Sequence, residues 1–259
     1  MSTQKRSDNS RRLLGIGVII MLLGVFFFVV GDGFSNREVL RASVSLPIAD
    51  AETATLTLRP GIVETTVRAG AGEGQLLDAD IEYYDAYHLT GSPGPQRNML
   101  LEHRPGDGNT FSIGPFGGDN NLEWDVRLNP GFPLAIDIDG DVGDFEMDLR
   151  DLNLTALDIS TDVGDVELDL PMPNQTYTVT INSDVGNVEV NVPAAAAVHI
   201  IAAADVGRLD IDDEIPERSR GDGVVGEAGE WQTDDFDAAE AQIIIEYSGD
   251  VGDLTVDVD

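Results

Sequence analysis

The tripeptide Asp-Val-Gly occurs five times in the second half of the chain, and its spacing restricts what the chain can fold into. It occupies residues 141–143, 162–164, 184–186, 205–207 and 250–252. The first four copies are 21, 22 and 21 residues apart, and the last follows after 45 residues, about one period plus an insertion. A repeat of this length is typical of a solenoid, in which each unit stacks on its neighbours.

Apolar residues flank every triplet at intervals of two. Around the first triplet they are Ile136 and Ile138 before the Asp, and Phe145 and Met147 after the Gly. Alternation of this kind is the period of a β-strand. Each repeat therefore predicts a strand, a tight turn and a second strand. We expect an all-β β-solenoid with about 21–22 residues per coil, in which the five units stack their apolar columns into one core.

The triplet itself has a mechanical interpretation. The Gly supplies the positive φ that a sharp turn demands, and the Asp accepts hydrogen bonds from the following backbone amides. We expect the Val to point inward and fill the corner. The sequence thus predicts structural turns at Asp141, Gly143, Asp162, Gly164, Asp184, Gly186, Asp205, Gly207, Asp250 and Gly252.

Acidic residues fill positions between the apolar columns, as at Glu146, Glu167 and Glu189. Since adjacent strands lie about 4.8 Å apart, they form carboxylate ladders, which suit either a solvated face or divalent cations. Residues 137–141 resemble a calcium loop at first sight. However, Val142 stands where an EF-hand needs Gly, Asp148 replaces the closing Glu, and the calcium β-roll nonapeptide is absent. We expect solvated acidic faces and no metal site, with calcium binding as the alternative.

Composition excludes several classes of protein. The chain has 48 Asp and Glu against 15 Lys and Arg, a formal net charge of -33, so it repels nucleic acid. It contains no cysteine, which rules out disulfides, zinc–thiolate sites, iron–sulfur clusters, a cysteine nucleophile and a lipidated cysteine. Apolar residues make up 42% of the chain, enough for a real core.

The sequence contains few residues or motifs that are typical of an enzyme active site. His88, His103 and His199 are the histidines, and no GxSxG, HExxH or phosphate-binding loop occurs. A glycosidase-like pair of carboxylates is the remaining option, but the acids fall on the exposed phase of the strands, where their pKa values are not shifted by burial. We predict no catalytic residues, no cofactor and no enzyme activity.

Leu13–Val30 is a run of eighteen apolar residues. As a helix it spans about 27 Å, close to the roughly 30 Å of a hydrocarbon core. Lys5, Arg6, Arg11 and Arg12 precede it, which places residues 1–12 in the cytoplasm and everything after the helix outside. A cleaved signal peptide is the alternative, but its apolar region is usually shorter. We predict a single-pass, uncleaved anchor in the cytoplasmic membrane.

The rest of the chain divides by composition. We expect a tether at 31–51, irregular first coils at 52–130, and the regular solenoid at 131–259 with a surface-loop insertion at 213–241. Trp231 and Phe236 are the large apolar residues of the insertion. They either fold back against the last coil or contact a partner.

Several stretches resemble a known family. Glu123–Pro130 leading into the first triplet, Leu152–Leu157 leading into the second, and Gly229–Trp231 with Phe236 and Ile243–Ile245 near the end are similar to toast-rack domains. That family includes LiaF-like cell-envelope stress proteins and candidate surface adhesins. The resemblance implies a β-solenoid outside the membrane without enzyme activity. LiaF-like members have several N-terminal membrane helices and restrain a sensor kinase, whereas one helix is predicted here.

The leading hypothesis is a membrane-anchored toast-rack protein that binds or scaffolds an envelope protein partner, with a role in envelope-stress sensing. An acidic surface adhesin or cation-binding domain is the second hypothesis, and an enzyme acting on envelope polysaccharide is the third.

Overall fold

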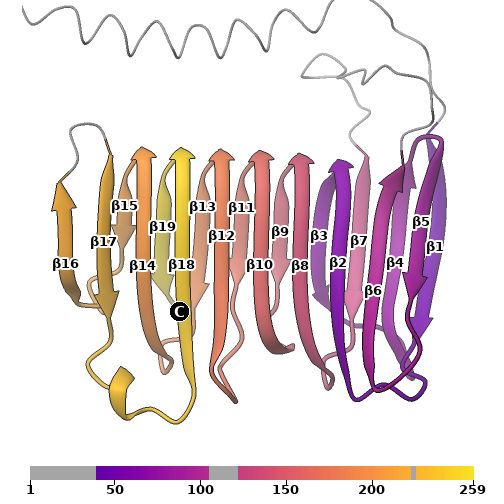
Figure 1. The fold of residues 1–259 in the computed structure, drawn as a ribbon, viewed down its shortest axis with the longest axis horizontal. Helices are drawn as coiled ribbons and strands as arrows, with labels where there is room; N and C mark the ends of the chain where they lie inside the picture. Colours follow the sequence, from indigo (N-terminus) through magenta and orange to yellow (C-terminus); the bar gives the residue numbers. More distant parts are fainter. Residues whose placement is uncertain (1–38, 105–121, 223–225) are drawn as a thin grey trace, which may run out of the picture. The chain divides into compact units, whose positions relative to one another are not determined.

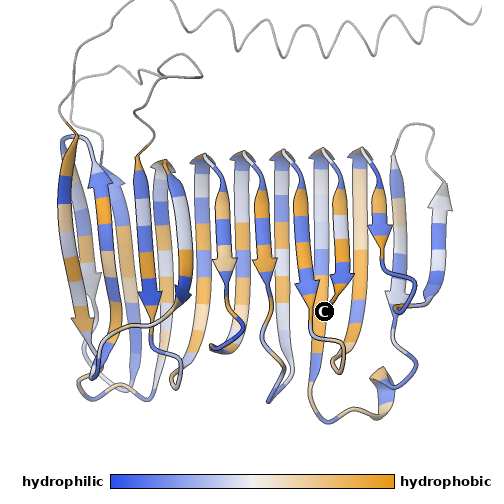
Figure 2. Ribbon diagram, turned by 180° about the vertical axis from the view of Figure 1, so that it is seen from behind, coloured by the Kyte–Doolittle hydropathy of each residue, from blue (hydrophilic) through white to orange (hydrophobic). Residues whose placement is uncertain are grey.

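The computed structural model of the protein describes residues 39–104, 122–222 and 226–259. Within these ranges every strand belongs to one of two β-sheets, which face each other across one continuous apolar core (Figures 1 and 2). The predicted all-β solenoid is confirmed. The predicted anchor at residues 13–30 lies outside the described residues. In the part of the chain that is described, no helix has the length and apolar character to cross a membrane.

The first sheet, sheet A, has nine strands. In spatial order they are β1 (Leu40–Pro47), β4 (Gln75–Tyr83), β7 (Glu123–Leu128), β3 (Glu64–Ala69), β9 (Phe145–Asp148), β11 (Val166–Asp169), β13 (Val188–Val192), β19 (Leu254–Val258) and β15 (Leu209–Ile211).

The second sheet, sheet B, has ten strands. In spatial order they are β16 (Glu217–Asp222), β17 (Glu227–Gln232), β14 (Ala197–Val206), β18 (Gln242–Val251), β12 (Tyr177–Val185), β10 (Asn153–Val163), β8 (Pro133–Val142), β2 (Thr53–Ile62), β6 (Gln96–Arg104) and β5 (Ala86–Gly91).

Each repeat forms one coil, with its first strand in sheet B and its second in sheet A. Equivalent strands of neighbouring coils pair in parallel and in register, so Ile136 lies opposite Leu157, and Leu157 opposite Val179. Their side chains alternate between the core and the outside, as the period of two predicts. The apolar columns of successive coils therefore fuse into a single core.

The first part of the chain is more regular than its composition suggests. β2 and β3 form a coil without a triplet, and both pair in parallel with the coil of the first triplet. β1 begins inside the stretch expected to be a tether and pairs antiparallel with β4. Its apolar residues Ala42, Val44 and Leu46 are only half-buried and pack at the margin of the core. An alternation this short gives a weak signal in the sequence, which is why the strand was not expected.

The order of the coils in space differs from their order in the chain. The coil that contains the fifth triplet, β18 and β19, lies between the coils of the third and fourth triplets. Thus β18 pairs with β12 on one side and with β14 on the other. The other side of β14 is occupied by the antiparallel strand β17. With that side covered, the free position beside β14 is the one between it and β12.

The insertion at 213–241, expected as a surface loop, contains an antiparallel hairpin. Its strands β16 and β17 extend sheet B beyond β14, and a single 3₁₀ turn, η1 (Phe236–Ala238), follows. Trp231 is 4% exposed and belongs to the core. Phe236 is half-buried and packs its ring edge-on against His199, with 5.3 Å between the ring centroids. Burial of this kind leaves almost none of the Trp231 side chain for a partner.

Candidate functional site

The five triplets lie side by side along one edge of the solenoid, where the chain turns from sheet B to sheet A. We call this line of turns the triplet edge. Neighbouring turns are joined directly, because the Gly of the first, second, third and fifth triplets donates its backbone N–H to the triplet Val carbonyl oxygen of the next coil in space. Gly143 donates to Val163 at 3.0 Å, and Gly186 donates to Val251 at the same distance.

Glycine is required at this edge mainly because the coils approach one another so closely. A Cβ on Gly186 would lie 1.9 Å from the carbonyl oxygen of Gly164, and one on Gly207 would lie 1.7 Å from that of Gly252. Gly186 also has a φ of +152°, which L residues rarely adopt, whereas Gly207 has no positive φ. The Gly column thus lets carbonyl groups stack where any side chain would collide.

Hydrogen bonding of the turns depends on the residue after each Gly and not on the triplet Asp. Asp144 accepts the backbone N–H of Asp165 at 3.0 Å, and Asp165 accepts that of Asn187 at 2.7 Å. Asn187 accepts the N–H of Asp253, which in turn accepts that of Arg208 at 2.8 Å. The sequence signal was an Asp or Asn after the Gly in every coil that accepts such a bond. The sequence alone does not reveal this role, because these positions look like the other acidic columns of the repeat.

This bonding pattern predicts different outcomes for two substitutions at Asp165. Asp165→Ala removes the acceptor of the Asn187 N–H, and we expect a loss of about 1 kcal/mol in the free energy of unfolding. Asp165→Asn keeps a carbonyl oxygen at the same place, as Asn187 does naturally, so we expect stability at or above that of the parent. Urea unfolding of both variants measures the difference, and equal losses would show that the bond contributes nothing.

The triplet valines point outward, so the prediction that they fill the corner is wrong. Val185, Val251 and Val206 are 45%, 39% and 38% exposed. The inward positions next to the corner belong instead to small residues such as Thr161 and Ser183, which are buried. The strand ends at the Val, and the turn that follows carries its side chain past the end of the core. Val142, Val163, Val185, Val251 and Val206 form a continuous outer row, which we call the valine row.

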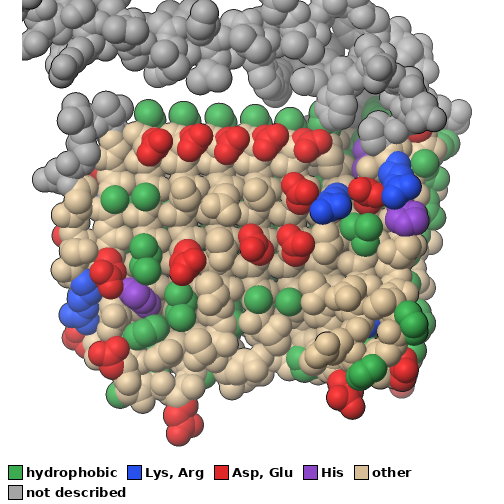
Figure 3. Space-filling view, in the orientation of Figure 1, with side chains coloured by type: hydrophobic (Ala, Val, Ile, Leu, Met, Phe, Trp, Pro, Cys, Tyr) green, Lys and Arg blue, Asp and Glu red, His purple; other side chains and the backbone are tan. Residues whose placement is uncertain are grey.

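The triplet aspartates form a second row beside the first, the aspartate row of Asp141, Asp162, Asp184, Asp250 and Asp205. Figure 3 shows acidic side chains aligned directly next to the apolar row at this edge. All five are exposed. Among the described residues, no Lys or Arg forms an ion pair with any of them. Partial desolvation raises the pKa of Asp141, and the carboxylates of Asp162 and Asp139 raise it further.

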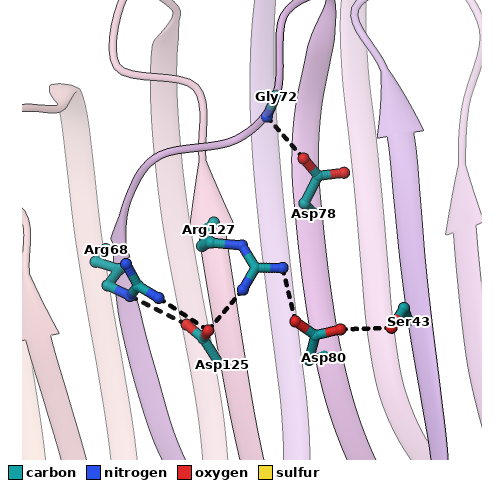
Figure 4. Close-up of polar contacts among 7 residues, drawn as sticks. All are labelled: Ser43, Arg68, Gly72, Asp78, Asp80, Asp125 and Arg127. Carbon is teal, nitrogen blue, oxygen red and sulfur yellow. Dashed lines mark hydrogen bonds and ion pairs between the residues drawn. The ribbon is translucent and has the colours of Figure 1, made fainter.

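A network of ion pairs and hydrogen bonds covers the outer face of sheet A at the end where β1 lies. It extends over β1, β4, β7 and β3 (Figure 4). Arg68 donates two hydrogen bonds to Asp125, at 3.2 and 2.9 Å. Arg127 bridges Asp125 and Asp80, at 2.6 and 2.8 Å. Asp80 also accepts a hydrogen bond from the Ser43 hydroxyl. Nearby, Asp78 accepts the backbone N–H of Gly72 at 2.7 Å. These contacts join the antiparallel first strands to the parallel coils, and both arginines are occupied by carboxylates.

The network makes a prediction about Asp80. The hydrogen bond from Ser43 and that from Arg127 lower the pKa of the Asp80 carboxyl. A lowered pKa in the folded state adds stability above the ordinary carboxyl range, and this stability is lost as pH falls through the lowered value. We expect Ser43→Ala to raise the pKa of Asp80 and to reduce that acid-side loss. Carboxyl NMR titration measures the pKa, and Ser45→Ala on the same strand is the control that should leave it unchanged.

The histidines are not brought together. His103 contacts the backbone of Tyr84, and His199 lies 2.9 Å from Glu230, while His88 lies on the edge strand β5. Within the described ranges no group of three His, Asp or Glu side chains is arranged to hold a metal ion. A cavity of about 30 Å³, lined by residues including Val192, Ile215 and Thr233, has room for about one water molecule.

Comparison with known proteins places this geometry in a family. A family model described as the N-terminal domain of toast_rack matches residues 35–191, more than half of the chain. The chain belongs to the toast-rack family. A second model, the C-terminal part of LiaF, described as a cell wall-active antibiotics response protein, matches residues 141–256. The toast-rack assignment is therefore LiaF-like, and the second match begins at the first triplet.

One solved structure shares this fold. A candidate cell adhesion protein from Clostridium sporogenes is 18% identical with a TM-score of 0.73, over 86% of this chain and 100% of that one. A candidate adhesin from Bacteroides fragilis is 12% identical over 87% of this chain and 100% of that one, but its TM-score is 0.32, too low for a structural argument. No curated protein matches the chain in sequence.

Proposed function

We propose that this toast-rack protein is a single-pass, membrane-anchored binding or scaffold module on the outer side of the cytoplasmic membrane, and that it acts in cell-envelope stress sensing through an envelope protein partner. The observation that carries the proposal is the form of the described domain. It presents long, in-register rows of side chains, and the cavity beside Val192, Ile215 and Thr233 has room for about one water molecule. Surfaces of this kind suit a macromolecular partner better than a small ligand.

The anchor and the stress role rest on sequence. Leu13–Val30 has the length and composition of a membrane helix, with basic residues before it. The LiaF-like match supports a place in the response to envelope damage. No catalytic role is proposed, because the families that match are not known as enzymes.

Crosslinking in intact cells tests the proposal. The full chain is expressed with an affinity tag, crosslinked with a membrane-impermeant reagent, purified under denaturing conditions and analysed by mass spectrometry. We expect a defined envelope protein whose yield changes when the cell wall is damaged. The control replaces the apolar residues 13–30 with a cleavable signal peptide, which should abolish the crosslink if anchoring is required. Recovery of sugar polymers alone would contradict the proposal.

A second candidate function is an acidic adhesin or cation-binding domain. The favouring observation is the likeness of the fold to the candidate cell adhesion protein from Clostridium sporogenes, together with the in-register acidic residues Glu146, Glu167 and Glu189. Thermal unfolding with and without millimolar calcium separates the two candidates. A large upward shift of Tm with calcium favours the second, and an unchanged Tm favours the first.

A further inference from the structure

The triplet edge is also the edge at which the described chain begins. Leu40 at the start of β1 pairs with Tyr83 at the end of β4, and β4 runs antiparallel to β7. β7 is in parallel register with β3, and β3 with β9, whose first residue follows the first triplet. The start of β1 therefore lies on the same side of the solenoid as the turns, as Figure 1 shows.

If the proposed anchor holds, the segment that follows it enters the described domain at the triplet edge. Eight residues, 31–38, separate Val30 from Val39. Fully extended, they reach about 30 Å. The inference below rests on the proposed function in this respect.

Two rows of side chains at the triplet edge lack a complementary partner within the described domain. The valine row exposes the apolar side chains of Val185, Val251 and Val206, and it continues through Val142 and Val163, which are half-buried. The aspartate row beside it carries five carboxylates without a cationic partner in the described ranges. Such carboxylates, repeated about every 4.8 Å, repel one another, and a cationic partner would relieve that repulsion.

These properties exclude two occupants. A lipid surface would cover the valines, but anionic headgroups repel the aspartates beside them. A second copy of the chain would bring the same aspartate row to the contact, so like charges would face each other across it. The occupant has to be apolar along one line and cationic along the next.

We propose that the triplet edge docks a basic amphipathic helix of a neighbouring membrane protein, with apolar side chains on the valine row and Lys or Arg on the aspartate row. A helix fits the spacing, because it rises about 5.4 Å per turn against about 4.8 Å per coil. Over the four steps of the five coils the mismatch is only about 2.4 Å, half a step. An extended strand advances about 6.7 Å for each side chain on one face and falls out of step within two coils.

The first experiment measures binding of a defined probe to the full chain in nanodiscs of neutral lipid. The probe is a synthetic helix of about fifteen residues, with Leu along one face and Lys along the adjacent face. We expect the double variant Asp184→Asn/Asp250→Asn to weaken binding at least tenfold, and Val185→Ser/Val251→Ser to do the same. The matched control Glu167→Gln/Glu189→Gln removes two neighbouring exposed carboxylates from sheet A and should leave affinity unchanged.

A peptide of the same composition in scrambled order should bind at least tenfold more weakly than the helix. Equal binding of the two peptides, or equal weakening by the sheet A variant, would show that only bulk charge is sensed and would overturn the proposal. Circular dichroism confirms that the variants, all at exposed positions, remain folded.

The second experiment separates this proposal from the proposed function. A photoreactive amino acid is placed in intact cells at Val185, or at Glu167 and Glu246 on the outer faces of the two sheets. If the helix docks at the triplet edge, we expect a crosslink from Val185 alone. The crosslinked site on the partner should lie in a basic amphipathic segment of a membrane protein. A protein crosslink from the faces and not from Val185 would keep the binding function and overturn the docking edge. Crosslinks from Val185 to lipid would assign the edge to the bilayer, and none at any position would remove both proposals.

Discussion

Gly186→Ala is expected to abolish the native fold, or to lower the free energy of unfolding by about 4 kcal/mol or more. The added Cβ would lie 1.9 Å from the carbonyl oxygen of Gly164 and 2.6 Å from its carbon. Both are backbone atoms in the next coil, so no side-chain rotation relieves the collision, and the two coils would have to separate. Because hydrogen bonds and core packing join the coils at that point, separation disrupts both.

Three further glycines separate the collision from backbone strain. Gly207→Ala tests the collision alone, since its φ is not positive but its Cβ would meet Gly252, and we expect a similarly large loss. Gly70→Ala tests the φ alone, at +127° with open space around it, and should cost about 1–2 kcal/mol. Gly131→Ala has neither problem and should be nearly neutral. Urea unfolding ranks the four, and a loss at Gly207 no larger than at Gly70 would refute the argument from close approach.

The second large effect concerns the position of the last coil. In a chain without cysteine, the pair Ala203→Cys and Ser248→Cys should form a disulfide almost completely, as should Asn182→Cys with Ser248→Cys. Ser248 lies opposite Ala203 on one side and opposite Asn182 on the other, and all three are exposed. Adjacent strands lie about 4.8 Å apart, within the Cα separation that a disulfide spans.

The pair Asn182→Cys and Ala203→Cys should not crosslink. With β18 between their strands, these residues are two strand spacings apart, about 9.6 Å, which exceeds the reach of a disulfide. If the coils stacked in chain order, β14 would lie between β12 and β18. Asn182→Cys would then crosslink to Ala203→Cys and not to Ser248→Cys, whereas Ala203→Cys with Ser248→Cys would form a disulfide in either order. Mobility on non-reducing gels and peptide mapping after mild oxidation distinguish the two orders.

The position of the last coil, β18 and β19, also changes which acidic residues are neighbours on sheet A. On sheet A, Thr255 of the last coil stands between Glu189 and Asp210, so two carboxylates that chain order would make neighbours are separated. The acidic face is thereby divided on one sheet, whereas the aspartate row at the triplet edge continues without interruption through all five coils. That contrast is one reason to place the partner at the edge and not on the face.

The amino-acid sequence alone determined the coil. The period of 21 or 22 residues, the apolar alternation and the Gly of each triplet predict a strand, a turn and a strand, because each depends on local geometry that repeats. It also indicated the family, since the spaced pattern is itself the family signature.

Tertiary structure decided what local geometry leaves open. The strands β12, β14 and β18 all carry an inward apolar column, so the repeat alone does not specify the order in which they pair. In the structure β17 covers one side of β14, and β18 lies on its other side, between β14 and β12. The valines look inward in sequence because the alternation places them there, but the strand ends at that residue and its side chain leaves the core. A repeat specifies each unit through contacts within it, whereas the order of the units and the surface at their turns depend on which neighbours are already in place.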